Sequence, residues 1–481
     1  MTTQAQTTTL AEYLHEHRDE HIARIQEYLR QPSVASANLG VTEGAELLAE
    51  HYRRLGCQEV ELIPSDGHPG LFAFYDAGAA KTLVVYGMWD TKPADEREWG
   101  GDPYAAKIEE KEGWGHAVSA PGAKGRKAPY MQFLNALEAL KAVKGELPVN
   151  ILFLGEGEEN NGSPNYKAFV EKYRERLAQA DACLAPGAIQ DADGALEIHL
   201  GFKGLLCAKL TASGLKSGVG PQSVPSHAMA QVIVDSPVWR LLSALGTLTD
   251  DDGRKITIDN FHDERQPVTD EERSEIRSLL EGYQGQPWQK VLPGIRDAKS
   301  SNDSLSQEEA FVHYFYEPNC NINGLAAGYT GPGTKVFTLP HEAYAMIDIR
   351  LPRGYSTVKS AERLKNHLVA RGFDDIDVEF TAMHEPMRTT TESDFVQTAL
   401  AVLEEHDLPV TLWPTSGGGG PWSLFAAYFG MPVLFDVGLG YGGNAGMPGE
   451  FLVLDEKGKI AGHEQAEMFY CELLERWAAA E

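Results

Sequence analysis

The strongest constraint on the fold is the alternation of amphipathic helical patterns with short segments that are apolar throughout. Segments of the first kind repeat apolar residues at helical spacing, and the first of them ends at Gln31-Pro32, where proline stops a helix. Segments of the second kind are typical of strands buried on both faces. The alternation predicts an α/β fold whose mostly parallel sheet is covered by helices. Predicted helices cover 10–30, 43–55 and 129–143, and predicted strands cover 81–86 and 148–154.

Two motifs directly follow predicted strands. The first is Gly87-Met88-Trp89-Asp90, and the second is the acidic segment from Gly155 to Gly162. In open α/β sheets the ligand cleft lies beyond the carboxyl ends of the strands. The two motifs therefore predict one site at that edge.

The pattern changes near Leu200. Strand-like segments are predicted at 205–211 and 343–351, with helices at 238–248 and 358–371, which indicates an inserted α+β domain. A helix at 393–406, a strand at 432–436 and a final helix at 463–479 indicate a return to the first domain. We therefore expect a discontinuous α/β domain of residues 1–198 and 387–481 and an inserted domain of residues 199–386.

Composition narrows the possible partners. The chain of 481 residues has 70 acidic and 42 basic residues and a formal net charge of -28, which opposes binding to nucleic acid or anionic membranes. No apolar run approaches the length of a membrane span, and the start resembles no secretory signal. Five scattered cysteines fit a reducing compartment. We expect a cytoplasmic protein that acts on a small molecule.

Several motifs, in this order and spacing, resemble those of metallopeptidase family twenty, which includes carnosine dipeptidases, succinyl-diaminopimelate desuccinylase, acetylornithine deacetylase and carboxypeptidase G. The resemblance implies a zinc-peptidase-like α/β domain with an inserted domain that mediates homodimer formation. It spans nearly the whole chain. The motifs are Tyr28 to Ser33, Leu83 to Asp95, Gly155 to Glu159 with Gly162-Ser163-Pro164, Gly328 to Gly333, and Arg350-Leu351-Pro352.

The resemblance also implies two zinc ions held by two histidines and three carboxylates, and this chain lacks those residues. The matching positions are Met88, Asn160, Pro186 and Gly446. The bridging aspartate belongs in the loop Gly115 to Lys127, yet no aspartate occurs between Asp102 and Asp181. A thioether, an amide, a proline and a glycine are poor or impossible zinc ligands. We therefore expect a site without metal or other cofactor.

What remains of the family pattern suggests roles for individual residues. Glu159 matches the general base, and Asp90 matches the residue that orients the first ligand. Fixed cations can replace metal ions in stabilising negative charge. The expected catalytic residues are Glu159, Asp90, Lys216 and Arg350; the expected substrate-binding residues are Lys124, Arg126, Lys127, His116, Asn323, Gly418 and Gly419. Ser119 and Ser416 lack a histidine at diagnostic spacing, so both are interpreted as loop residues.

Four functions stay open at this point. The first is metal-independent hydrolysis of an amide in a small, amino-acid-derived substrate that bears a carboxylate. The second is a lyase, isomerase or cyclase reaction that begins with proton abstraction in the same site. The third is a zinc-dependent dipeptidase with a rearranged site, and the fourth is a dimer that binds a small molecule without turnover. The residues available to a rearranged zinc site are Asp90, Glu156, Glu158, Glu159 and His116.

Overall fold

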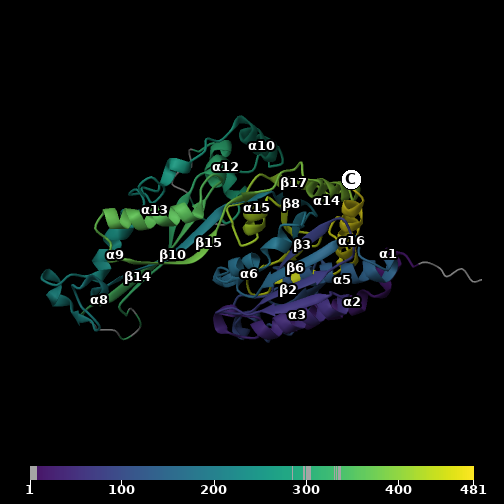
Figure 1. Ribbon diagram of the computed structural model, residues 1–481, viewed down its shortest axis with the longest axis horizontal. Helices are drawn as coiled ribbons and strands as arrows, with labels where there is room; N and C mark the ends of the chain where they lie inside the picture. The colour runs from purple at the N-terminus through teal and green to yellow at the C-terminus, as the bar shows by residue number, and fades with distance from the viewer. Residues whose placement is uncertain are drawn as a thin grey trace, which may run out of the picture. The chain divides into compact units, whose positions relative to one another are not determined.

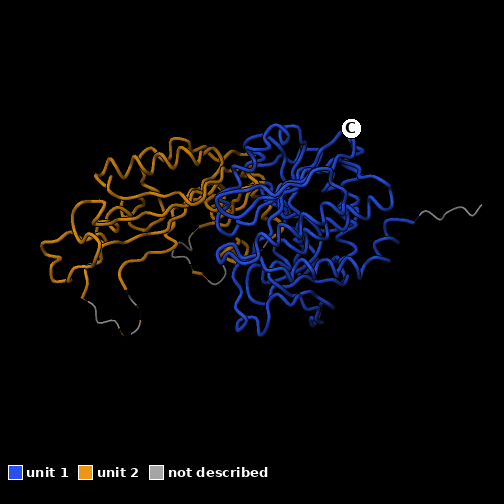
Figure 2. Tube along the Cα trace, turned by 60° about the horizontal axis from the view of Figure 1, so that its bottom comes forward, with its two compact units in different colours: residues 1–200, 388–414, 424–481 blue, residues 201–387, 415–423 orange. Residues whose placement is uncertain are grey.

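The computed structural model describes residues 8–480 except 284, 296–297, 300–304, 330, 332 and 334–336. Part of the motif Gly328 to Gly333 therefore lies outside the described residues. The chain forms two compact units (Figure 2): unit 1 comprises residues 1–200, 388–414 and 424–481, and unit 2 comprises residues 201–387 and 415–423. None of the helices in the described part is both long and apolar enough to cross a membrane.

The unit boundaries differ from the expected domains mainly at residues 415–423. The sequence analysis assigned this segment to the α/β domain, but it belongs to unit 2. Backbone hydrogen bonds give the reason, because Ser416 N–H donates to Gly201 O at 2.7 Å and Lys203 N–H donates to Ser416 O at 3.1 Å. These bonds join the glycine run after Ser416 to the start of unit 2.

The core of unit 1 is a six-stranded sheet with the order β1-β2-β6-β3-β7-β18 (Figure 1). Strands β6, β3, β7 and β18 are parallel, and β2 and β1 extend the sheet with antiparallel pairing. The predicted α/β fold class is confirmed. The strands are β1 (Glu59–Ile63), β2 (Gly70–Tyr75), β3 (Thr82–Met88), β6 (Asn150–Glu156), β7 (Ala182–Pro186) and β18 (Val433–Val437).

Helices cover both faces of this sheet. Successive side chains of a strand point to opposite faces, so the contacts of individual strand residues show which helix lies on which face. On one face Tyr52 of α3 stacks on Phe153 of β6 with ring centroids 4.3 Å apart. On the other face Tyr86 of β3 meets the ring of Tyr166 of α6 at 5.3 Å. The longer helices of unit 1 are α1 (Leu10–Glu16), α2 (Arg18–Arg30), α3 (Val41–Leu55), α5 (Lys127–Lys144), α6 (Tyr166–Lys172), α14 (Asp394–Glu405), α15 (Ser423–Phe429) and α16 (His463–Ala479).

Two local predictions in unit 1 are wrong. The helix expected over 10–30 is interrupted at His17, whose ring nitrogen Nδ1 bonds to the carbonyl of Tyr13 at 2.9 Å and whose backbone leaves the helical region. The segment from Gly115, expected to be a loop, begins with strand β5 (Gly115–Ser119). This strand pairs with β4 (Lys107–Lys111) and β20 (Phe451–Val453) in a sheet that β19 (Gly442–Gly443) completes.

Unit 2 contains a four-stranded antiparallel sheet with the order β12-β14-β10-β15. Helices α9 (Pro237–Leu245) and α13 (Thr357–Ala370) pack on one face of this sheet, where alternate residues of β10 are buried. The remaining strands and longer helices are β10 (Gly204–Ser213), β12 (Asn319–Ala327), β14 (Glu342–Leu351), β15 (Asp377–His384), α10 (Asp270–Glu281) and α12 (Gln307–Tyr316).

One buried carboxylate connects the two loops that approach the carboxyl edge of the main sheet in unit 1. Glu450 is only 2% exposed. Its Oε1 accepts hydrogen bonds from the N–H groups of Lys124 and Gly125 at 2.9 and 2.6 Å. Its Oε2 accepts from the N–H groups of Gly122 and Gly446 at 3.0 and 3.1 Å. Four backbone donors from residues 122–125 and 446 therefore converge on one anion, which fixes both loops.

Replacing Glu450 with Gln is expected to lower the free energy of unfolding by about 2 kcal/mol, because the new NH₂ group leaves two buried N–H groups without an acceptor. Urea denaturation followed by circular dichroism measures this change. The matched control is Glu456→Gln, because Glu456 is exposed and lies between Glu450 and the final helix α16. Equal unfolding midpoints for the two variants would contradict a role of Glu450 in holding the loops.

Candidate functional site

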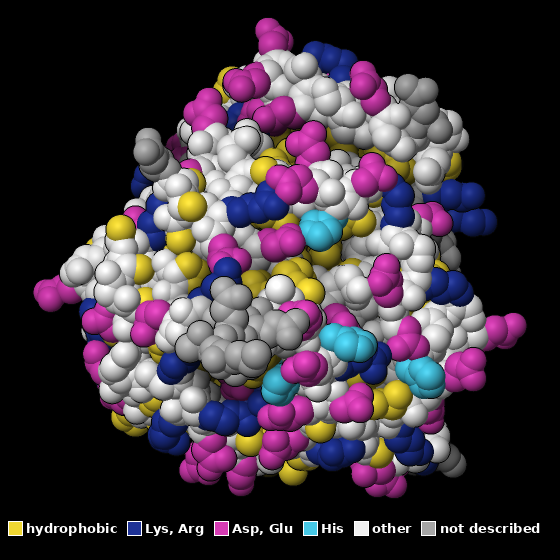
Figure 3. Space-filling view, turned by 90° about the vertical axis from the view of Figure 1, so that its right-hand side faces the viewer, with side chains coloured by type: hydrophobic (Ala, Val, Ile, Leu, Met, Phe, Trp, Pro, Cys, Tyr) yellow, Lys and Arg dark blue, Asp and Glu magenta, His cyan; other side chains and the backbone are white. Residues whose placement is uncertain are grey.

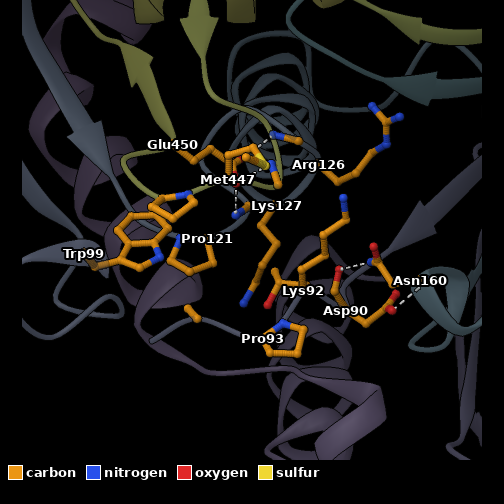
Figure 4. Close-up of a pocket in the computed structure, with 16 residues that line it drawn as sticks. Asp90, Lys92, Pro93, Trp99, Pro121, Arg126, Lys127, Asn160, Met447 and Glu450 are labelled. Carbon is orange, nitrogen blue, oxygen red and sulfur yellow. Dashed lines mark hydrogen bonds between the residues drawn. The ribbon is translucent and has the colours of Figure 1, made fainter. Parts of the chain in front are cut away.

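A pocket in unit 1 lies beyond the carboxyl ends of β3 and β6, where the sequence predicted a site. Figure 4 shows Asp90 and Asn160 on one side, Glu450 and Met447 on the other, and the side chains of Lys92 and Lys127 between them. The lining residues that carry the argument are Asp90, Lys92, Trp99, Arg126, Lys127, Asn160, Gly446, Met447 and Glu450.

Asp90 joins the end of β3 to the acidic motif after β6. Its Oδ1 accepts from Glu159 N–H at 3.0 Å, its Oδ2 accepts from Asn160 N–H at 2.9 Å, and the Asn160 side chain donates to Asp90 O at 3.2 Å. Both carboxylate oxygens therefore bind the backbone of the motif. The structure supports a positioning role for Asp90 with respect to Glu159.

The other two acidic side chains of the motif are bound within the protein. Glu156 is buried, and its Oε1 accepts hydrogen bonds from the hydroxyls of Tyr86 and Ser163 at 2.9 and 2.8 Å. Burial raises the pKa of Glu156 well above its usual value, and the nearby charge of Asp90 raises it further. Glu158 accepts from the side chain of Asn165 at 2.6 Å. Glu156 is therefore a buried hydrogen-bonding group whose neutral form is favoured.

Glu159 is the half-buried acid of this motif; it is not among the residues that line the pocket, but its neighbour Asn160 is. Burial raises its pKa above the usual value, and the negative charge of Asp90 acts in the same direction. The positive charges of Arg126 and Lys92 lower the pKa of Glu159 and thus partly offset this rise. A carboxylate whose pKa is raised in this way is a stronger base when ionised.

Lys92 was not predicted from the sequence, although it follows the motif Gly87 to Asp90 by two residues. Its ammonium nitrogen lies 3.2 Å from the point where a side chain at Gly446 would begin. Gly446 has the position that the family resemblance assigns to a histidine ligand. The ammonium group thus occupies space that such a ligand would need.

The three basic residues predicted from the loop sequence have different surroundings. Arg126 donates from Nη1 to Asp436 Oδ1 at 2.5 Å, its guanidinium lies 4.5 Å from the ring centre of Phe435, and its buried Nε has no hydrogen-bond partner. Lys124 contributes its backbone N–H to the Glu450 contact. Arg126 therefore lines the pocket with a guanidinium that is held by Asp436 and has one buried, unpartnered nitrogen.

Lys127, predicted to bind substrate, is the first residue of α5 and is only 1% exposed. Its Nζ donates to Gln31 O at 2.7 Å and lies 4.5 Å from the ring centre of Tyr28. Burial lowers the pKa of Lys127 to about 7. These contacts direct the amine to the chain segment before α3 and make Lys127 a structural cation of the pocket wall.

The residues of the pocket do not fit a dinuclear zinc site. Met88, Asn160 and Pro186 offer no anionic or imidazole donor, and the φ of +67° at Gly446 disfavours a side chain there. The carboxylates of Asp90 and Glu450 are already bound to backbone N–H groups. Among the described residues, no group of three His, Cys, Asp or Glu donors with metal-binding spacing lies at this pocket.

His116 lies apart from the residues that line the pocket. Its Nδ1 bonds to Asp455 Oδ2 at 2.8 Å, and its side chain is 61% exposed. This contact joins β5 to the segment after β20. The geometry therefore does not support His116 as an acid or base.

Five predicted site residues belong to unit 2 and do not line the pocket in unit 1: Lys216, Asn323, Arg350, Gly418 and Gly419. Arg350 of β14 pairs with Asp348 at 3.0 Å, and Lys216 pairs with Asp377. The side chain of Asn323 on β12 accepts from Asn321 at 2.6 Å. Gly418 N–H donates to Ser416 Oγ at 3.2 Å, and a side chain at Gly419 would overlap the carbonyl of Lys203.

Comparison with known proteins identifies the family. The model of peptidase family M20/M25/M40 matches residues 84–462. A Beta-Ala-His dipeptidase of Homo sapiens is 26% identical over 382 residues, covering 74% of this chain and 70% of the relative. A Cys-Gly metallodipeptidase, DUG1, of Saccharomyces cerevisiae is 22% identical over 401 residues, covering 78% of this chain and 76% of the relative.

Solved structures agree with this assignment. An M20 family metallo-carboxypeptidase, Sso-CP2 of Sulfolobus solfataricus, has a TM-score of 0.83 and 29% sequence identity, covering 96% of this chain and all of the other. Human carnosine dipeptidase 1 has a TM-score of 0.73 at 21% identity, covering 98% of this chain and 99% of the other. The chain thus belongs to peptidase family M20/M25/M40 and is a hydrolase-like enzyme of that family.

Proposed function

We propose that this enzyme hydrolyses an amide bond in a small, amino-acid-derived substrate that bears a carboxylate, and that it does so without a catalytic metal ion. The observation that carries this proposal is the set of contacts at the former ligand positions. Lys92 lies against Gly446, Asn160 binds Asp90, and Glu450 holds the loop that lacks the bridging aspartate.

Glu159 is the general base in this proposal. It takes a proton from a water molecule while the water oxygen bonds to the amide carbon. Its raised pKa makes the carboxylate a stronger base than an exposed glutamate. The protonated Glu159 then gives the proton to the leaving nitrogen as the C–N bond breaks, so that each turnover consumes one water molecule.

Lys92 and the positive charge of Arg126 stabilise the negative charge that develops on the carbonyl oxygen. Both cations act on the Glu159 carboxylate electrostatically, which supports their position near the reacting groups. Fixed cations at a partly buried site need little reorganisation when charge develops. They can therefore take over part of the role that zinc has in metal-dependent relatives.

A rearranged zinc site is not supported by the contacts of the candidate ligands. Asp90 binds backbone N–H groups, Glu156 accepts from Tyr86 and Ser163, and Glu158 accepts from Asn165. His116 binds Asp455. Four of the five side chains therefore have other partners, which leaves Glu159 as the candidate for chemistry.

A small-molecule substrate also agrees with the charge of the chain. The formal net charge is -28, and on the face in Figure 3 basic side chains lie among acidic ones instead of forming one continuous basic area. Phosphate backbones and anionic lipids need such an area for tight binding. We therefore infer no nucleic-acid or membrane partner.

Glu159→Gln is expected to reduce kcat by at least about 10²-fold, because an amide cannot accept the proton from water. Turnover of a panel of dipeptides and N-acyl amino acids, followed by mass spectrometry, measures the change. The wild-type rate should persist after brief treatment with a chelator. In H₂¹⁸O, hydrolysis places the label in the product carboxylate, whereas a lyase, isomerase or cyclase reaction does not.

Glu158→Gln is the matched control, since it changes the neighbouring carboxylate to an amide. It should retain turnover. Full activity of Glu159→Gln would refute the role of the base, and inactivation by the chelator followed by recovery with zinc would refute metal-independent catalysis.

Lys92→Met is expected to move the acidic limb of the kcat/KM profile to higher pH. The active form has an ionised Glu159, and loss of a nearby positive charge raises the pKa of this carboxyl group. The variant should also lose about 10²-fold in kcat, as for removal of one transition-state donor. Lys107→Met, an exposed change on β4, is the control; an unshifted limb in Lys92→Met would contradict this arrangement.

We also propose that the protein forms a homodimer through unit 2. Apolar side chains between residues 215 and 239 are strongly exposed, including Ile233 at 86%, Val232 at 85% and Trp239 at 62%. Strand β12 forms an edge of the unit 2 sheet, with Ile322 and Leu325 about half exposed. Large exposed apolar groups and an open strand edge are features of an interface.

The double variant Ile233→Glu/Trp239→Glu is expected to shift the protein from dimer to monomer, because burying two carboxylates in an apolar interface is unfavourable. Gel filtration with light scattering measures the mass. Leu39→Glu, an exposed apolar position in unit 1, is the control and should remain dimeric. A monomeric wild-type protein would refute the proposal.

A further inference from the structure

Apart from the residues that line the pocket, unit 1 contains a buried group of two histidines and one glutamate. His21 lies on α2, and His463 and Glu467 lie one turn apart on α16. All three side chains are fully buried. Helices α2 and α16 both pack against α5 (Figure 1), which contributes Gln132 and Asn135 to the same region.

The two imidazoles meet the same carboxylate. His21 Nδ1 lies 2.8 Å from Glu467 Oε2, and His463 Nε2 lies 3.0 Å from Glu467 Oε1. Asn135 donates to Oε1 at 2.8 Å and thereby orients the carboxylate. Donors of metal-binding type from all three residues lie within 4.8 Å of one another.

Several polar atoms of this group lack hydrogen-bond partners despite complete burial. They are His463 Nε2, His21 Nε2 and Gln132 Oε1. His463 Nε2 lies close to Glu467, but the angle between them does not allow a hydrogen bond. Buried polar atoms without partners are unfavourable. The group is therefore incompletely satisfied as it stands.

The amide of Gln132 gives a more specific indication. Its nitrogen is placed 3.2 Å from His463 Nδ1, while its oxygen has no partner. A half-turn of the amide exchanges its two atoms and lets the oxygen accept from Nδ1–H. The lone pair of His463 Nε2 then faces the Glu467 carboxylate at 3.0 Å, and two such electron pairs repel unless a cation lies between them.

The local charge also favours a cation. The nearest fixed charges are Arg24, which binds Glu20, Glu138 and the side chain of Asn135, and Arg54, which also binds Glu138. Arg24 and Arg54 carry two positive charges, and Glu20, Glu138 and Glu467 carry three negative charges. One negative charge therefore remains before the histidines are counted.

We propose that His21, His463 and Glu467 bind one divalent transition-metal ion of the zinc type. Two imidazoles with one carboxylate form a common zinc ligand set. Tetrahedral zinc with bonds of about 2.0–2.1 Å places its donors about 3.3 Å apart. The histidine nitrogens lie 2.8 and 3.0 Å from the two oxygens of Glu467, and the donor atoms of all three residues lie within 4.8 Å of one another, so the side chains must rearrange to surround one ion.

The role of this ion is structural. It would connect α2 to the first turns of α16, and Asn135 and Gln132 would orient two of the ligands through hydrogen bonds, as outer-shell residues do at metal sites. None of the three ligands lines the pocket. The ion therefore takes no part in the hydrolysis proposed above.

The test is the metal content of untagged full-length protein by plasma mass spectrometry. The expected result is about one zinc ion per chain in wild type, since one three-residue site holds one ion. Glu467→Gln should lose this ion, because the neutral amide keeps the size of the side chain but not its charge. Glu464→Gln, on the same helix and bound to His15, is the matched control and should keep it.

A second measurement does not depend on the folding of a variant. X-ray absorption at the zinc edge of the wild-type protein should show two imidazole ligands, and cobalt substitution should give the visible bands of a tetrahedral site. Wild-type protein without metal after zinc soaking would overturn the proposal. About two ions per chain, lost in Asp90→Asn but kept in Glu467→Gln, would overturn both this site and the metal-free pocket.

Discussion

The arrangement of the pocket depends on the contact between the Glu450 carboxylate and four backbone N–H groups. A metal ion could join the same loops only if they supplied several donor side chains, and apart from Glu450 itself residues 122–125 and 446–449 contain no carboxylate or imidazole. Glu450 supplies the negative charge from within the protein, and the loops supply the donors. An anion among converging N–H groups is stable when buried because every polar group has a partner. The loops can therefore keep their positions without metal.

A second carboxylate, that of Asp90, links the acidic motif to the end of β3. Asp90 binds the N–H groups of Glu159 and Asn160. Met88 and Asn160 stand at two of the positions that match zinc ligands in the family, and this contact joins the segments that contain them. This contact brings several acids close together and contributes to the raised pKa values of Glu156 and Glu159. Lys92 and Arg126 supply compensating positive charge, which lowers the pKa of Glu159 and favours the ionised form that the proposed base requires.

The sequence predicted most of the fold but only part of the site. The strands at 81–86 and 148–154 and the helix at 463–479 correspond to β3, β6 and α16, because buried apolar runs and helical periodicity are local signals. Glu450 and Lys92 could not be recognised in this way. Glu450 binds Gly122, and Lys92 lies against Gly446, and the two members of each pair are far apart in the chain. No sequence motif predicts either contact.

The cluster of His21, His463 and Glu467 shows why metal content and metal-dependent catalysis are separate questions in this chain. Its donors lie on α2 and α16, whereas the proposed reaction centres on groups that follow β3 and β6. Loss of an ion from the cluster would weaken the packing of two helices and leave the charges around Glu159 in place. Stability and turnover should therefore respond independently to metal, since the residues that bind the ion and those that bind the substrate share no side chain.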